Sequence, residues 1–159
     1  MTHSITCPSP VGVLTLAGDG ERLSGLWIAG QRYHGAVSPA PPAPLPIFEE
    51  AQIWLKRYFA GEKPAISDLP LAPVGSSFRQ AVWSLLCEIP YGQTSTYGEI
   101  ARRLATAPRA VGAAIGRNPI SIIIPCHRVV GADGSLTGYA GGLDVKRRLL
   151  QLENQELLG

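Results

Sequence analysis

Apolar and polar residues alternate near the start of the chain and later recur at helical spacing, which predicts a small unit of strands followed by one helix. Alternation over residues 11–16 predicts a first strand, and a Gly-Asp-Gly turn at 18–20 leads into a second at 23–28. Residues 39–46 form a proline-rich connector. A helix is then expected to end at Gly61, because its apolar residues keep a helical period up to that point. They are Ile47, Ala51, Trp54, Leu55 and Tyr58.

A second proline-containing connector, residues 62–75, has no apolar period. It predicts a boundary between an N-terminal α/β domain at 1–74 and a C-terminal domain at 75–159. The second domain is expected to open with a helix, because residues 77–80 have the pattern of a capping box. The core-facing stripe predicted on this helix is Phe78, Val82, Leu85 and Leu86, with Trp83 and Cys87 as packing residues.

Two short helices are predicted next, and together they indicate a helix-turn-helix. Thr96 and Glu99 have the spacing of a second capping box, which opens a helix through Ala105. Pro108 then favours a helix start, and residues 109–116 are rich in Ala and Gly. Small side chains on this helix would let its backbone approach a surface closely, and the amides at its N-terminus would favour a phosphate. The same residues would equally permit close packing between helices in the core.

The apolar run at 120–124 is rich in isoleucine and lies between two prolines, so it predicts a buried strand. Pro125 cannot donate to a ladder, and the strand is therefore expected to stop there and release Cys126 into a turn or cleft wall. Further on, the pair at 133–134, Asp-Gly, is a hairpin signal, and this hairpin would form the wing of a winged helix.

A final helix is predicted from the leucines between residues 143 and 152, with Glu153 at its end. Lys146, Arg147 and Arg148 are expected to point to solvent from it. The whole pattern predicts an α/β fold of the α+β type. A small N-terminal strand and helix domain precedes a helical winged helix-turn-helix domain that carries Cys126.

Charge is distributed unevenly between the two predicted domains. The 159 residues have a net charge of only +2. Residues 1–74 carry 5 Lys/Arg against 6 Asp/Glu, whereas residues 75–159 carry 9 against 6. The positive excess therefore lies in the half with Cys126, and it weakly favours a polyanionic partner.

The cysteines Cys7, Cys87 and Cys126 are irregularly spaced and predict neither a disulfide framework nor a zinc site. A reducing compartment fits best, so the expected location is cytoplasmic, or nucleoid-associated in a prokaryote. No stretch reaches transmembrane length and no signal-peptide core is present, so no membrane partner is expected.

Cys126 is the strongest candidate for chemistry. It is followed by His127 and Arg128, and a thiol beside an imidazole and a cation has the ingredients of an activated nucleophile. A free cysteine more often packs as a small hydrophobic residue. From the residue types alone, both interpretations stay open.

The string Pro-Cys-His-Arg-Val at 125–129 resembles the active-site motif of the O6-alkylguanine-DNA alkyltransferases, also called methylated-DNA–protein-cysteine methyltransferases. The similarity extends over residues 78–153. It implies DNA repair by direct reversal, in which the alkyl group of O6-alkylguanine moves irreversibly to Cys126, with O4-alkylthymine as a second candidate substrate. The enzyme would react once, without a cofactor or metal. The implied partner is lesion-containing double-stranded DNA, and the free protein would be monomeric without an obligate protein partner.

The resemblance also implies a role for each matching residue. In the reaction, Cys126 would accept the alkyl group, His127 take the thiol proton, Glu153 orient His127, Asn118 hold the cysteine turn and Tyr97 donate to the departing oxygen. On DNA, Arg109 would fill the gap left by a flipped nucleotide, Ala110 would lie on the minor-groove helix, and Gly98 and Ala132 would contact phosphates. Around the base, Tyr139, Ala140 and Val129 would form the binding site.

Two other classes of function stay open. One is a winged-helix DNA-binding protein without chemistry, such as the alkyltransferase-like proteins that lack the cysteine; Cys126 argues against it. The other is a thiol hydrolase, which needs water to resolve a covalent adduct. Only three histidines are present, and His127 is the one with supporting residues.

Overall fold

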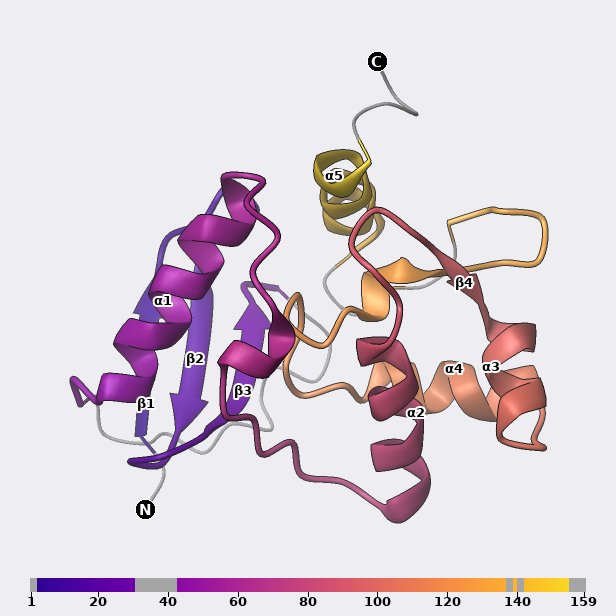
Figure 1. The fold of residues 1–159 in the computed structure, drawn as a ribbon, viewed down its shortest axis with the longest axis horizontal. Coiled ribbons are helices and arrows are strands. Elements are labelled where there is room, and N and C mark those ends of the chain that lie inside the picture. The colour runs from indigo at the N-terminus through magenta and orange to yellow at the C-terminus, as the bar shows by residue number, and fades with distance from the viewer. Residues whose placement is uncertain (1–2, 31–42, 137–138, 140–141, 155–159) are drawn as a thin grey trace.

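The computed structural model describes residues 3–30, 43–136, 139 and 142–154. Its N-terminal half contains an antiparallel sheet in the order β1-β2-β3, in which β1 is His3–Cys7, β2 is Leu14–Gly18 and β3 is Leu23–Ile28. Helix α1, Pro46–Phe59, lies across one face of this sheet (Figure 1). The sheet and α1 enclose the first part of the hydrophobic core.

The sequence predicts two strands where three form. The strand expected at 11–16 begins only at Leu14, because Gly12 has a φ of 116° and its N–H donates to the Ser9 carbonyl in a turn (3.1 Å). Strand β1 has four half-buried residues and one exposed residue. Its sequence therefore lacks the alternation by which a strand with one buried face is recognised.

Helix α1 confirms its prediction. Pro46 stands in its first turn, where a missing N–H is tolerated. Gly61, with a φ of 83°, follows the cap residue Ala60 and ends the helix. The buried face consists of Ile47, Phe48, Ala51, Trp54, Leu55 and Tyr58.

The C-terminal half is mainly helical, and the expected mixed α/β fold is confirmed. Helices α3 and α4 pack against each other, with α2 beside them (Figure 1). A short 3-10 helix, η2 (Ile66–Asp68), lies in the connector. The elements that follow are α2 (Ser77–Cys87), β4 (Ser95–Thr96), α3 (Tyr97–Arg103), α4 (Pro108–Gly116), the 3-10 helix η3 (Cys126–Arg128), β5 (Val129–Val130) and α5 (Leu143–Glu153).

The capping pattern explains where α3 and α4 begin. The Thr96 hydroxyl accepts a hydrogen bond from the Glu99 N–H at 3.1 Å, as the capping box predicts. Pro108 stands in the first turn of α4, also as predicted. Ala105 ends the first of these helices with a φ of 53°, and the Thr106 N–H donates back to the Ala101 carbonyl at 3.0 Å.

Helix α2 differs from its prediction in two respects. Its N-cap is Ser76 rather than Ser77, and the Ser76 hydroxyl accepts from the Arg79 N–H at 3.2 Å. Phe78, expected in the core, is 37% exposed, and it lies in the first turn of α2, ahead of the residues that this helix buries. The buried face runs through Val82, Trp83 and Leu86.

Residues 120–124 do not form the predicted strand. Only Ile120 makes a β-bridge, to Leu26, and the chain then turns tightly, with the Ile124 N–H donating to the Ile120 carbonyl at 3.0 Å. Ile122 has a φ of 72°, which a β-branched residue rarely adopts. The isoleucines are buried all the same. An apolar run shows that a segment is buried but not whether its backbone is extended.

The predicted wing hairpin does not form within the described part of the chain. A turn does occur at 131–135, where the Gly131 N–H donates to the Ser135 carbonyl at 2.9 Å. Strand β5, however, pairs in parallel with β4, aligning Ser95 with Val129. Residues 137 and 138, which would continue the second arm of the hairpin, lie outside the described residues.

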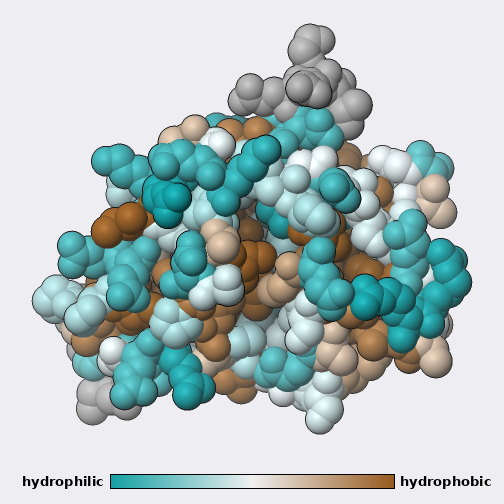
Figure 2. All heavy atoms as spheres, viewed as in Figure 1, coloured by the Kyte–Doolittle hydropathy of each residue, from teal (hydrophilic) through white to brown (hydrophobic). Residues whose placement is uncertain are grey.

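The two halves are joined along the outer edge of β3. The Leu26 N–H donates to the Pro119 carbonyl at 2.8 Å, and the Ser121 N–H donates to the Leu26 carbonyl at 3.0 Å. On the face shown in Figure 2, hydrophilic side chains cover much of the periphery and hydrophobic surface is concentrated between the halves. None of the described helices is long and apolar enough to cross a membrane.

Candidate active site

Cys126 is the first residue of η3 and is only 3% exposed. Its N–H donates to the Ile124 carbonyl at 2.8 Å, and its own carbonyl accepts from the Val129 N–H. The expected placement in a turn is confirmed. The sulfur lies below the surface on a backbone that is hydrogen-bonded on both sides.

Asn118 holds the turn that carries the cysteine. Its Nδ2 donates to the Ile124 carbonyl at 2.9 Å, and its Oδ1 accepts from the Ile120 N–H at 3.0 Å. Asn118 is buried, so one amide satisfies two backbone groups that are themselves buried. It also keeps in place the left-handed Ile122, a conformation that costs on the order of 1–3 kcal/mol.

Glu153, at the end of α5, is the centre of a buried polar cluster. Its Oε2 lies 2.6 Å from His127 Nε2. Arg128 donates from Nε to Oε1 at 2.7 Å and from Nη2 to Oε2 at 3.1 Å, while its Nη1 donates to the Ile89 carbonyl at 2.7 Å. The Tyr58 hydroxyl donates to Oε2. Both oxygens of this carboxylate thus accept hydrogen bonds, as a buried charge requires.

The environment makes His127 a neutral base and Glu153 an anion. Burial lowers the pKa of His127, although Glu153 opposes the shift. Burial by itself would raise the pKa of Glu153, but the hydrogen bonds and charges of His127 and Arg128 more than offset it and hold this pKa at about 2. Because the Glu153 carboxylate can only accept at Nε2, the proton of the neutral imidazole is on Nε2. The buried Nδ1 makes no hydrogen bond within the described residues and is the basic nitrogen.

Lys146 does not point to solvent as predicted. It is fully buried, and its Nζ donates to the Val129 carbonyl at 2.6 Å. Burial lowers the pKa of Lys146 to about 8, while the charge of a Cys126 thiolate would raise it. Lys146 lies seven residues before Glu153 on the same face of α5, so the spacing that directs Glu153 inward also directs Lys146 inward.

The Cys126 thiol is neutral at rest. Burial raises its pKa, and this effect exceeds the lowering by the Asn118 hydrogen bond and the Lys146 charge. Tyr139 lies close to the Cys126 thiol. Its hydroxyl is buried, faces Cys126 and Ser121, and makes no hydrogen bond of ordinary geometry within the described residues. Burial raises the pKa of Tyr139 well above its usual value. The thiol, the phenol and the ammonium group thus surround one small region.

The predicted DNA-contacting residues lie on α3 and α4. Arg109 is exposed in the first turn of α4, and Ala110 beside it is half-buried. Tyr97 begins α3 with its ring alongside α4, about van der Waals distance from the position that a side chain on Gly112 would take. Gly98 follows it and is half-buried.

Two further predicted residues lie after β5. Ala132 is exposed in the turn at 131–135. Ala140 lies outside the described residues. Val129 is fully buried, and its carbonyl already accepts from Lys146. A carbonyl has two lone pairs, so this contact leaves one acceptor position for another donor.

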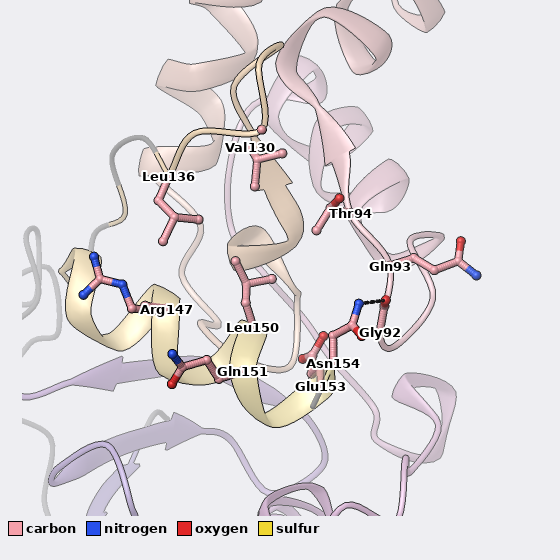
Figure 3. A pocket seen from close by; sticks show the side chains of 11 residues that line it. Gly92, Gln93, Thr94, Val130, Leu136, Arg147, Leu150, Gln151, Glu153 and Asn154 are labelled. Atoms are coloured by element: carbon pink, nitrogen blue, oxygen red, sulfur yellow. Dashed lines mark hydrogen bonds between the residues drawn. The ribbon is translucent and has the colours of Figure 1, made fainter. Parts of the chain in front are cut away.

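A cavity of about 400 Å³ opens between α5, β5 and the loop before β4 (Figure 3). Cys126 does not line it, but Glu153 does. At one edge the Asn154 amide donates to the Gly92 carbonyl at 2.9 Å, which ties the end of α5 to that loop. The lining residues are Gly92, Gln93, Thr94, Val130, Gly134, Leu136, Arg147, Leu150, Gln151, Glu153 and Asn154.

Three buried residues of the site have no role in the sequence interpretation: Tyr58, Arg128 and Lys146. Tyr58 is predicted to face the core, but nothing in the sequence indicates that it contacts a residue 95 positions away. Arg128 is noted only as a cation beyond the imidazole.

Within the described ranges, no group of three or more His, Cys, Asp or Glu side chains could hold a metal ion.

Comparison with known proteins assigns the chain to a family. Residues 77–155 match the family model of the 6-O-methylguanine DNA methyltransferase DNA binding domain, and residues 3–73 match the ribonuclease-like domain of the same enzymes. A methylated-DNA–protein-cysteine methyltransferase from Haemophilus influenzae is 49% identical over 148 residues, covering 92% of this chain and 83% of the relative. One from Methanosarcina acetivorans is 50% identical over 147 residues, covering 91% and 94%.

Solved structures show the same likeness. The crystal structure of Mycobacterium tuberculosis OGT in complex with DNA matches with a TM-score of 0.85 and 48% identity, covering 96% of this chain and 93% of that chain. The O6-methylguanine-DNA methyltransferase of Pyrococcus kodakaraensis matches with a TM-score of 0.70 and 26% identity, covering 96% and 99%. Both halves of the sequence and the fold as a whole therefore agree, and the chain belongs to the 6-O-methylguanine DNA methyltransferase family.

Proposed function

We propose that this protein repairs DNA by transferring the alkyl group of O6-alkylguanine to Cys126. The observation that carries the proposal is the buried His127–Glu153 pair, 2.6 Å apart, next to a buried cysteine in a turn held on both sides. A thiol with an oriented imidazole beside it is the arrangement of an activated nucleophile. The names of the relatives, methylated-DNA–protein-cysteine methyltransferases, support the same reaction.

The proton leaves the thiol in the first step. Because burial raises the pKa of Cys126, the thiol must be deprotonated during the reaction. His127 accepts the proton at Nδ1 through one water molecule, since successive residues of a 3-10 turn point in different directions. Glu153 stabilises the imidazolium that results. The Lys146 charge and the Asn118 amide stabilise the thiolate.

The thiolate then attacks the sp³ carbon of the lesion in line with the bond to O6. A carbon–sulfur bond forms and the carbon–oxygen bond breaks, so the guanine oxygen leaves with the electron pair. Tyr97 donates a hydrogen bond to the departing guanine, which stabilises the developing charge. The guanine then takes up the proton from the His127 imidazolium through water, so the products are S-alkylcysteine, neutral His127 and an unmodified base.

The target carbon must first be brought out of the duplex, which requires a few kcal/mol of unstacking. Arg109 fills the gap in the stack, and Ala110 lets α4 lie close to the minor groove. The backbone at Gly98 and at Ala132 contacts phosphates. The extruded base lies between Tyr139, Ala140 and the Val129 backbone. Sequence preference is slight, since recognition rests on backbone contacts and on the damage itself.

Each molecule reacts once. The thioether offers water no suitable leaving group, and none of the site residues described above could remove the alkyl group. The protein is therefore consumed stoichiometrically.

We also propose that it is monomeric when free and acts in the cytoplasm or nucleoid; its three cysteines are free, which fits a reducing compartment.

Intact-mass spectrometry tests the reaction directly. After incubation with a duplex containing one O6-methylguanine, the protein should gain the mass of one CH₂ group, and peptide mapping should place it on Cys126. Cys126→Ala should gain nothing, whereas Cys87→Ala, which removes a half-buried thiol of the same half, should react like the wild type. Repair beyond one equivalent per protein, or methyl transfer to another residue, would contradict the proposal.

A further inference from the structure

We infer that Tyr58, in the N-terminal half, is a positioning residue for alkyl transfer, because its hydroxyl holds the Glu153 carboxylate in the orientation that serves His127. The inference rests on the proposed function, in which His127 is the base. It gives the N-terminal half a part in the reaction. Nothing in the roles described above requires any residue before Tyr97.

The contact itself is specific. Tyr58 is 1% exposed, and its hydroxyl donates to Glu153 Oε2, the same oxygen that lies 2.6 Å from His127 Nε2. The two residues are 95 positions apart in the sequence. A single carboxylate oxygen thus connects helix α1 to the base of the reaction.

The ring of Tyr58 is fixed by aromatic neighbours. Trp54 stacks on it with ring centroids 5.6 Å apart and an interplanar angle of 8°, and the Trp54 indole N–H donates to the Ala65 carbonyl at 2.8 Å. Phe59 and Tyr91 contact it edge-on, at 5.2 Å and 5.8 Å. A ring held on three sides has little rotational freedom, so the position of its hydroxyl is set before any substrate binds.

The other donors to Glu153 do not replace this contact. Arg128 occupies Oε1 through Nε and reaches Oε2 only at 3.1 Å. Without the Tyr58 hydroxyl, Oε2 would keep more negative charge and more freedom to move. Both changes act on His127: the added charge favours its imidazolium form, and the movement loosens its alignment. The remaining charged groups that face His127, Arg128 and Lys146, act in the opposite direction and are unchanged by the substitution.

The test is the pH dependence of single-turnover methyl transfer by Tyr58→Phe, measured at saturating concentrations of the O6-methylguanine duplex. The rate constant should fall on the order of tenfold, the scale at which outer partners of an oriented histidine act. The ascending limb of the pH profile, where His127 loses its proton, should move to higher pH. A merely structural role would lower the rate without moving that limb.

Tyr91→Phe is the matched control. It removes a hydroxyl from the same aromatic cluster, but this hydroxyl donates to the Leu152 carbonyl at 3.3 Å and not to Glu153. Its pH profile should coincide with that of the wild type. A Tyr58→Phe profile that also coincides with the wild type, or one that is slower with an unmoved limb, would overturn the inference. A wild-type protein that transfers no methyl group would instead overturn the proposed function.

A second measurement covers the case in which Tyr58→Phe does not fold. In the wild-type protein, the carbon-13 chemical shift of the Tyr58 ring carbon that carries the hydroxyl reports its hydrogen bond. Glu153→Gln should change this shift, because a neutral amide accepts a weaker hydrogen bond than a carboxylate. An unchanged shift would show that the contact is not formed in solution.

Discussion

The ammonium group of Lys146 donates to the Val129 carbonyl at 2.6 Å, from a side chain with no exposed surface. The cation therefore lies on the backbone three residues after Cys126, where its charge lowers the pKa of the thiol. A buried lysine loses its hydration, and here burial lowers its own pKa to about 8. Near neutral pH it is still mostly charged, so the thiolate forms beside a cation.

Lys146→Met should slow methyl transfer at pH 7 by on the order of tenfold, the effect of about one pKa unit on the thiol. The deficit should shrink above pH 8, because the wild-type lysine then loses its own charge. Single-turnover rates between pH 6.5 and 9.5 would measure it. Arg147→Met, which removes an exposed cation from the same helix, is the control. Equal rates for Lys146→Met and the wild type at pH 7 would contradict the role of the charge.

Asn118→Ala should destabilise the protein and slow the reaction. It leaves the Ile120 N–H and the Ile124 carbonyl buried without their partner, which costs about 2–6 kcal/mol for the two groups together. Urea denaturation measures the free energy of unfolding. Asn154→Ala, which removes one half-buried hydrogen bond to the Gly92 carbonyl, should cost less. If both substitutions cost the same, the turn does not depend on Asn118.

Acid should destabilise the protein in two steps. The pKa of His127 is lowered in the folded state, so the unfolded chain binds an extra proton below about pH 6.5 and stability falls with pH by up to about 1.4 kcal/mol per pH unit. Glu153 adds a second loss as the pH falls from its unfolded pKa, near 4.5, towards about 2.

Urea titrations at pH 7.5, 6.5 and 5.5 would measure the first step. In His127→Gln the slope over this range should be smaller. An equal slope in the two proteins would assign the acid sensitivity to other groups.

Methylation of Cys126 should lower the stability of the protein. The sulfur is 3% exposed, and an added methyl group forces its neighbours apart, which typically costs about 1–3 kcal/mol in a packed interior. Thermal unfolding of the reacted protein, separated from DNA, should show a transition several degrees lower. A melting temperature equal to or above that of the unreacted protein would contradict this.

Arg109→Ala should impair reaction with duplex DNA but not with the modified base alone. Arg109 is exposed at the start of α4 and does not belong to the buried cluster around Glu153. Its loss should therefore reduce the rate on an O6-methylguanine duplex and leave the rate with free O6-alkylguanine unchanged. Arg57→Ala, an exposed arginine of α1, controls for charge. Equal losses on both substrates would show that Arg109 affects the chemistry itself.

Much of the fold follows from local sequence. Helices α1, α3 and α4 appear where apolar spacing and capping residues predict them, because both signals act within a few residues. The errors concern hydrogen bonds and strand pairings that the spacing of apolar residues does not indicate. Residues 120–124 are folded into a turn by the Asn118 side chain, and β5 pairs with β4 instead of forming a hairpin.

The residues of the site divide in the same way, into those that local sequence reveals and those that depend on the folded chain. Cys126 and His127 are evident from the sequence because they are adjacent and their chemistry is distinctive. Lys146 is assigned to solvent from its charge, although its helical position relative to Glu153 directs it inward. Tyr58 could not be connected to Glu153 at all, since only the packing of one half on the other brings them together.

The hydrogen bond between Tyr58 and Glu153 makes the alignment of the base depend on residues from both halves of the chain. Glu153 follows His127 by 26 residues and Tyr58 by 95, so it is the last of the three to be synthesised. The three side chains come together only when α1 and α5 are both in place. A chain that ends before α5 therefore contains the acceptor sulfur and its imidazole but not the carboxylate that aligns them.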